Sequence, residues 1–164
     1  RSHGRPFGSI YFDFQRIGFN SRMNELTAGV GLEGLENFDK TFNKRKENFY
    51  KLMNLIKGLS EYCYFPKEEN YEKLSPHAFS VLLRDKKYDG PKFYKYMESK
   101  GIQCKTLFGS LPTQHKAFKF LNYKFGQFPV SEYAGEQGLH FGMHQYLTDD
   151  DLVFISDTMK SYFK

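Results

Sequence analysis

Histidines are the residues of this sequence best suited to acid–base or metal chemistry. They stand at His3, His77, His115, His140 and His144. On a helix, two histidines four positions apart would lie on one face and could share a metal ion, and His140 and His144 have that spacing. Here, however, the pair spans the end of a predicted strand, Leu139–Met143, and the loop after it, and no HExxH pattern is present. The sequence therefore predicts no metal site.

Other patterns that mark catalytic or phosphate-binding sites are also missing. There is no P-loop and no GxGxxG, and no serine lies in a nucleophile signature. Asp149–Asp151 follow Thr148, which indicates the capped start of a helix more than a cation site. Cys63 and Cys104 lie far apart and outside a CxxC, so we expect two buried or free thiols. From the residues alone, we expect no catalytic residue in this chain.

Length and charge limit the function classes. A chain of 164 residues can bury one adequate core. The net charge of +5 is moderate, and its lysines and arginines alternate with acidic residues, which is typical of solvated helix faces. No apolar run approaches the roughly 18 residues needed to cross a bilayer, and no signal peptide is visible. We expect a cytoplasmic protein without a nucleic-acid or membrane partner; an RNA-binding or other non-enzymatic interaction module is the competing class.

The stretch from Ser21 to Gly58 is mostly helical in pattern. We expect one helix to about Glu33, a break, and a second helix from about Leu35 to Lys57, because glycines interrupt the first third and each costs about 1 kcal/mol inside a helix. Apolar residues recur at helical spacing and predict a stripe that faces a core or a partner. The first members of the stripe are Met23, Leu26, Val30, Leu35 and Phe38.

The second half predicts an α+β unit with a three-stranded sheet. The expected strands are Phe79–Leu83, Ile102–Phe108 and Leu139–Met143, in one sheet backed by helices Pro91–Lys100 and Asp149–Tyr162. Glu61–Ser75 reads as a connection, and Val130–Glu136 suits a short helix. Gly109–Pro129 is a long irregular segment, and loops of that length are usually functional or ordered by a partner.

Several blocks of the sequence, in order, resemble one enzyme family. They are His3-Gly4-Arg5, then GFNSRMNELTAGVGLEGLENFDKTFNKRKENFYKL from Gly18 to Leu52, then SKGIQCKTLFGSLPTQHKAF and FPVSEYAGEQGLHFGMHQYLTDDDL. These blocks resemble the second half of the DegT/StrS family of pyridoxal-phosphate-dependent nucleotide-sugar aminotransferases, and the PTQ-x-x-AF variant is similar to the perosamine synthase-like members. The resemblance spans almost the whole chain.

The resemblance implies the C-terminal portion of a fold-type I pyridoxal-phosphate transferase. Residues 1–20 would be a residual strip and loop of the large domain, residues 21–58 the connecting helices, and residues 59–164 the small α+β domain. The lysine that forms the Schiff base and most groups that hold the cofactor would then lie upstream of Arg1. We expect the intact parent to use pyridoxal phosphate, and this portion alone to bind none and to be inactive.

The implied parent reaction is transfer of an amino group from an amino acid, commonly glutamate, to a keto-sugar nucleotide, in the biosynthesis of surface polysaccharides or amino sugars. The alternative within the family is a 4-keto-6-deoxy-sugar 3-dehydratase, in which a histidine replaces the Schiff-base lysine. The residue that decides between them is not in this chain.

The resemblance also implies binding residues. Asn20 and Arg22 match positions that reach the cofactor phosphate of the dimer mate, and a donor just before a helix N-terminus suits phosphate; Asn20 could instead form a turn, and Arg22 a structural salt bridge. His77, Phe108 and His144 are the expected substrate-binding residues. Ala78 stands where many members carry an aromatic residue, so it bears on substrate choice. The segment 18–38 would form a homodimer interface.

Overall fold

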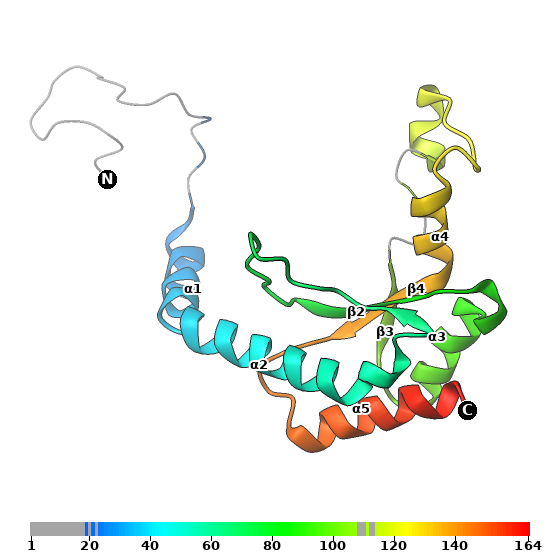
Figure 1. Cartoon of the computed structure of the whole chain (residues 1–164). Helices are drawn as coiled ribbons and strands as arrows, with labels where there is room; N and C mark the ends of the chain where they lie inside the picture. Colours follow the sequence, from blue (N-terminus) through cyan, green and yellow to red (C-terminus); the bar gives the residue numbers. More distant parts are fainter. Residues whose placement is uncertain (1–18, 20, 22, 108–110, 112–113) are drawn as a thin grey trace, which may run out of the picture. The chain divides into compact units, whose positions relative to one another are not determined.

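The computed structural model describes residues 19, 21, 23–107, 111 and 114–164 (Figure 1). Contacts divide the chain between Phe38 and Asp39. No helix among the described residues is both long enough and apolar enough to cross a membrane.

The first long helix, α1, spans Glu25–Glu36. Asn24 caps it, because its Oδ1 accepts a hydrogen bond of 2.8 Å from the backbone N–H of Thr27. The break predicted just after Glu33 is wrong by a few residues: Gly34 stays helical, and the helix ends at Asn37, where the side-chain amide turns back to the carbonyl oxygen of Glu33 at 3.1 Å. One glycine costs too little to stop a helix.

No residue of α1 is buried. The first members of the predicted apolar stripe are exposed, with Leu26 86%, Val30 73% and Leu35 70% exposed. Its last members, Phe49, Leu52 and Ile56, are buried, so the expectation that the stripe faces a core holds only for its second half.

The second long helix, α2, spans Phe38–Ile56 and continues into the short helix η1, Lys57–Leu59. One side of α2 is buried, and Phe49, Leu52 and Ile56 lie on that side. Asn48 is buried beside them, a polar side chain on an otherwise apolar face.

The sheet has four antiparallel strands, and the prediction of three was wrong. Their order is β1 (Cys63–Tyr64), β2 (Ala78–Leu83), β4 (Gly138–Gly142) and β3 (Cys104–Thr106). The additional strand, β1, lies inside the segment expected to be a connection, and its two residues are too few for an alternating pattern. The three predicted strands do lie in one sheet, which confirms that expectation.

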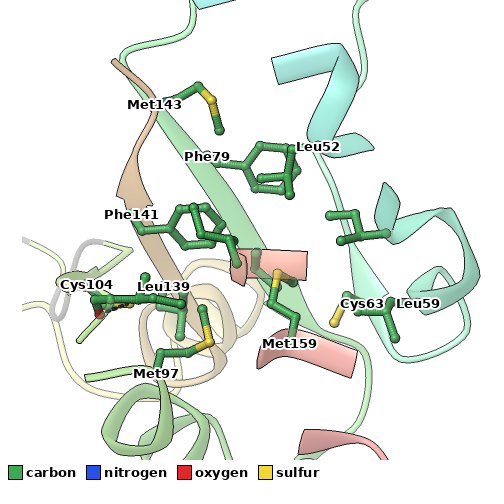
Figure 2. Packing of buried hydrophobic residues seen from close by; sticks show 14 of the residues in the cluster. Leu52, Leu59, Cys63, Phe79, Met97, Cys104, Leu139, Phe141, Met143 and Met159 are labelled. Atoms are coloured by element: carbon green, nitrogen blue, oxygen red, sulfur yellow. Dashed lines mark hydrogen bonds between the residues drawn. The ribbon is translucent and has the colours of Figure 1, made fainter. Parts of the chain in front are cut away.

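Helices α2, α3 (Gly90–Ser99) and α5 (Asp149–Tyr162) supply the side chains that pack on one face of this sheet. Phe79 of β2 stacks on Phe141 of β4 with ring centroids 5.5 Å apart. Figure 2 shows Leu52 beside Phe79, and Met159 further along the same cluster of buried side chains. The helices predicted at Pro91–Lys100 and Asp149–Tyr162 are thus confirmed as the backing layer.

The cap predicted at Thr148 is present, because Thr148 forms a capping box with Asp151 at the start of α5. At the start of α3, Asp89 Oδ1 accepts from the N–H of Lys92 at 3.0 Å. Cys63 and Cys104 are free and buried, as expected. Burial raises the pKa of each thiol to about 12.

Helix α4 (Pro129–Gln137) leads directly into β4. A Cβ atom on Gly138 would lie 2.4 Å from the carbonyl oxygen of Ala134 and 2.6 Å from Cδ1 of Leu107. Only a glycine allows this approach. Two short helices complete the described elements, η2 (Lys86–Tyr88) and η4 (Lys116–Leu121); η4 lies within the segment expected to be irregular.

Candidate functional site

The predicted site residues fall into two groups. Asn20, Arg22 and Phe108 lie outside the described residues, so their predicted roles stay predictions. His77 is exposed and directly precedes β2, and His144 is exposed two residues after β4. No hydrogen bond or ring contact joins these two histidines in the described chain.

Polar side chains gather on the face of the sheet opposite the core. Along β2, Phe79, Val81 and Leu83 are buried, whereas Ala78, Ser80 and Leu82 are only half-buried. His140 of β4 pairs with Ser80 on one side and with Lys105 of β3 on the other. Because directly paired residues share a face, Ser80, His140 and Lys105 form a row across three neighbouring strands. We call these three residues the open-face row.

The electrostatics of the open-face row centre on His140. Its pKa is lowered, first by burial and then by electrostatic interaction with His77 and Lys105, which favours the neutral form of its imidazole. A neutral imidazole can both donate and accept a hydrogen bond, and the neighbouring hydroxyl and ammonium add further donors. The row can therefore bind a polar ligand or move a proton.

His77 ends the segment between β1 and β2, and Glu68 attaches this segment to α2. Oε1 of Glu68 accepts from Nζ of Lys46 at 2.7 Å and from the backbone N–H of Leu74 at 2.8 Å, and Oε2 accepts from the hydroxyl of Tyr50. These hydrogen bonds, with that from Lys46 the largest cause, lower the pKa of Glu68 to about 2.

The loop that carries His144 is attached to α2 by three side chains. Arg45 Nε donates to Oε1 of Gln145 at 3.0 Å, and Lys51 Nζ lies 2.6 Å from a carboxylate oxygen of Asp149. Between them, Nδ2 of Asn48 donates to two carbonyl oxygens of the loop. Arg45 and Asn48 belong to the Arg-x-x-Asn pattern of the sequence, so the structure gives that pattern a positioning role.

The segment before α4 is organised by another carboxylate. Glu132 accepts from Nε2 of Gln114 at 2.7 Å and from the backbone N–H groups of Gly126 and Phe128. The described part of this segment displays exposed aromatic side chains. They are Phe118, Phe120, Tyr123 and Phe125.

The lysines of the chain do not fit the Schiff-base position of a pyridoxal-phosphate enzyme. All of them lie in the described part, and none is buried. Carboxylate partners raise the pKa of Lys51, Lys86 and Lys92, through Asp149, Glu136 and Asp89 respectively, whereas a Schiff-base lysine needs an amine that loses its proton readily. No group of three or more potential metal ligands occurs among the described residues.

The order of sequence blocks and this α+β architecture agree with one family. The model of the DegT/DnrJ/EryC1/StrS aminotransferase family matches residues 1–160. This chain belongs to that family. Its members include sugar aminotransferases and sugar 3-dehydratases.

Two relatives illustrate this range of chemistry. This DegT/DnrJ/EryC1/StrS chain is 28% identical over 182 residues to the UDP-4-amino-4,6-dideoxy-N-acetyl-beta-L-altrosamine transaminase of Campylobacter jejuni, covering 98% of this chain and 43% of the relative. It is 22% identical over 152 residues to the GDP-4-keto-6-deoxy-D-mannose 3-dehydratase of Escherichia coli, covering 91% of this chain and 38% of the relative.

Solved structures in the family share the fold. The structure of DesV from S. venezuelae, in complex with a ketimine intermediate, matches with a TM-score of 0.78 at 19% identity, over 98% of this chain and 42% of that one. The structural neighbours include the sugar aminotransferase CalS13 from Micromonospora echinospora and a GDP-4-keto-6-deoxymannose-3-dehydratase. The chain spans between 33% and 43% of the length of its curated relatives.

Proposed function

We propose that this chain is part of a pyridoxal-phosphate-dependent enzyme that transfers an amino group from an amino acid, glutamate, to a keto-sugar nucleotide. The observation that carries the proposal is the family match over residues 1–160. The C. jejuni relative supports it, because it is a transaminase of a UDP-linked amino sugar. The pathway would build surface polysaccharides or other amino sugars, in the cytoplasm.

Within that enzyme, residues 21–58 would connect a large domain to a small domain formed by residues 59–164, with residues 1–20 as a strip of the large domain. Asn20 and Arg22 would reach the cofactor phosphate of a dimer mate. His77, Phe108 and His144 would face the sugar nucleotide. The exposed stripe of α1 supports a homodimer through residues 18–38, because contiguous apolar surface of this kind usually has a partner.

The Schiff-base lysine would come from a segment outside this sequence. The exposure of the lysines here, and their carboxylate partners, support this assignment. The cofactor supplies the electron sink for the transfer, and this chain would position the substrate. Alone, it would bind no pyridoxal phosphate at a specific lysine and would be inactive.

Dehydration at C3 of a 4-keto-6-deoxy sugar is the second candidate, favoured by the relatives that are 3-dehydratases. One assay separates the two. The full-length protein is incubated with pyridoxal phosphate, glutamate and a GDP- or UDP-linked 4-keto-6-deoxy sugar. Transamination gives 2-oxoglutarate and a sugar nucleotide in which an amine replaces the keto oxygen. Dehydration gives a product that retains the keto group and has lost the C3 hydroxyl. If neither product forms with any tested sugar, the proposal is contradicted.

A further inference from the structure

The open-face row presents side chains that have no partner in the described chain. Ser80, His140 and Lys105 make no side-chain hydrogen bond or ion pair with other described residues. This distinguishes Lys105 from lysines such as Lys46 and Lys51, which lie 2.7 Å and 2.6 Å from carboxylate oxygens. Donors on a rigid sheet that are not used within the fold remain available to a ligand.

Lys105 gives the row a positive charge. His77, just ahead of β2, and Lys105 on β3 both act on His140 so as to disfavour a positive charge on its ring. Glu98 of α3 is already engaged, since its Oε1 accepts from the backbone N–H of Cys104 at 2.5 Å. An anion placed over the row would meet donors and positive charge.

The spacing of the donors favours an extended anion. Neighbouring strands lie about 4.8 Å apart, so a row over three strands spans about 10 Å at the backbone. A single carboxylate is too small to reach side chains from all three strands. Two linked phosphoryl groups present several charged oxygens and reach further than a single carboxylate does.

The row is also held in place from below. Directly under it, on the covered face, Phe79 stacks on Phe141, and Phe49 of α2 lies 5.1 Å from Phe79 between ring centroids. The three strands are paired by backbone hydrogen bonds in fixed register. Binding would therefore require little reordering of the backbone, which favours affinity.

We propose that Ser80, His140 and Lys105, flanked by His77, form an anion-binding site on the open face of the sheet that takes the diphosphate of the nucleotide-sugar substrate. The diphosphate assignment rests on the proposed function; the anion site itself rests on the geometry. Lys105 supplies the charge, Ser80 a hydroxyl donor, and His140 an N–H donor from a neutral ring.

A titration of the isotopically labelled chain with pyrophosphate, followed by NMR, tests the site. We expect saturable shifts of the ring C–H signals of His140 and His77 and of the backbone amide of Lys105. Lys105→Glu should weaken binding by roughly tenfold or more, the effect of losing a hydrogen bond to a charged group. Lys57→Glu makes the same charge change at an exposed lysine on η1 and should alter affinity by less than about twofold. Circular dichroism verifies that both variants fold.

The proposal is overturned if pyrophosphate leaves the His140 signals unchanged, or if the Lys105→Glu and Lys57→Glu variants bind equally well. Further ligands identify the source of the anion. UDP or GDP binding at the row, without binding of uridine or guanosine, supports the diphosphate assignment. Pyridoxal phosphate or glutamate binding there in preference to both nucleotides overturns it. If pyrophosphate binds at the row and neither nucleotide does, the anion site stands and the proposed nucleotide-sugar function loses support.

Discussion

Asn48 and His144 stand 96 residues apart in the sequence and are joined by a hydrogen bond of 3.1 Å, from Nδ2 of Asn48 to the backbone carbonyl oxygen of His144. The same amide donates to the carbonyl oxygen of Leu147 at 3.3 Å. Asn48 is fully buried. Water therefore cannot easily replace its amide as the hydrogen-bond donor to these two carbonyl oxygens. The contact fixes the loop between β4 and α5 on α2.

Replacement of Asn48 by alanine should destabilise the 39–164 unit. The loop carbonyls would lose their donor and a small cavity would form, so we expect a loss of about 2–4 kcal/mol in the free energy of unfolding. Urea denaturation measures it. Asn54→Ala, at an exposed position of the same helix, should change the free energy by less than about 0.5 kcal/mol. Equal effects of the two variants would show that the buried amide of Asn48 contributes no more to the free energy of unfolding than the exposed amide of Asn54.

Gly138→Ala should also be destabilising, because its new Cβ would overlap the carbonyl oxygen of Ala134 and the side chain of Leu107. Forcing backbone atoms apart in a packed region costs about 1–3 kcal/mol. Circular dichroism during thermal unfolding gives the melting temperatures of the variant and the wild type for comparison. Gly58→Ala is the matched control, since nothing lies within 4 Å of its added methyl group. A Gly138→Ala variant as stable as Gly58→Ala would contradict the close packing of α4 on β4.

Glu68 should make stability depend on acid pH. Its pKa is lowered from 4.5 to about 2 in the folded chain, chiefly by the hydrogen bond from Lys46, so the unfolded chain binds the proton more readily. The stabilisation is therefore present above about pH 4.5 and is lost as the pH falls from 4.5 towards 2.

Melting temperatures of wild type and Glu68→Gln, measured from pH 7 to pH 2, test this dependence. The variant should melt lower at pH 7, and the two curves should converge near pH 2. Glu69→Gln removes an exposed carboxylate that pairs with Lys67, and should have the smaller effect at pH 7. Parallel curves for wild type and Glu68→Gln would refute the role of Glu68.

Pyridoxal phosphate followed by borohydride should not label one specific lysine of this chain. No lysine is buried, and the ion pairs of Lys51, Lys86 and Lys92 favour the protonated amine. We expect low labelling spread over several surface lysines, read by peptide mass spectrometry. Stoichiometric modification of a single lysine would mean that the chain carries its own Schiff-base residue.

The chain should self-associate through α1. Leu26 and Val30 are among its most exposed apolar residues, and a second copy would cover them. Light scattering at micromolar concentration should detect a dimer or larger species that the double variant Leu26→Glu, Val30→Glu reduces to monomer. Val153→Glu, at an exposed valine of α5, should leave association unchanged. A wild-type monomer across this concentration range would count against the interface.

Features encoded by neighbouring residues were predictable from the sequence. Thr148 followed by Asp149–Asp151 marked the start of α5, because a cap involves only residues a few positions apart. Lys105 and Ser80 were not predicted as site residues. Their assignment to the proposed site depends on the pairing of both residues with His140. Strand register between segments so distant in sequence leaves no local signal in the sequence. β1 was missed for the same reason, since Cys63 and Tyr64 become a strand only through pairing with β2.

The central position of β4 has a consequence for how the chain acquires its structure during synthesis. β4 pairs with both β2 and β3, yet it is the last strand to be made, and α5 follows it. Until Gly138–Gly142 emerge, β3 has no neighbour, and β1 with β2 forms a two-stranded ribbon of the kind that is marginal in water. Phe79 can meet Phe49 of α2 early, but Phe141, the ring that stacks on it, lies on β4 and is made late. The sheet of the 39–164 unit can therefore be completed only after β4 has been synthesised, and such non-local pairing is slow to form.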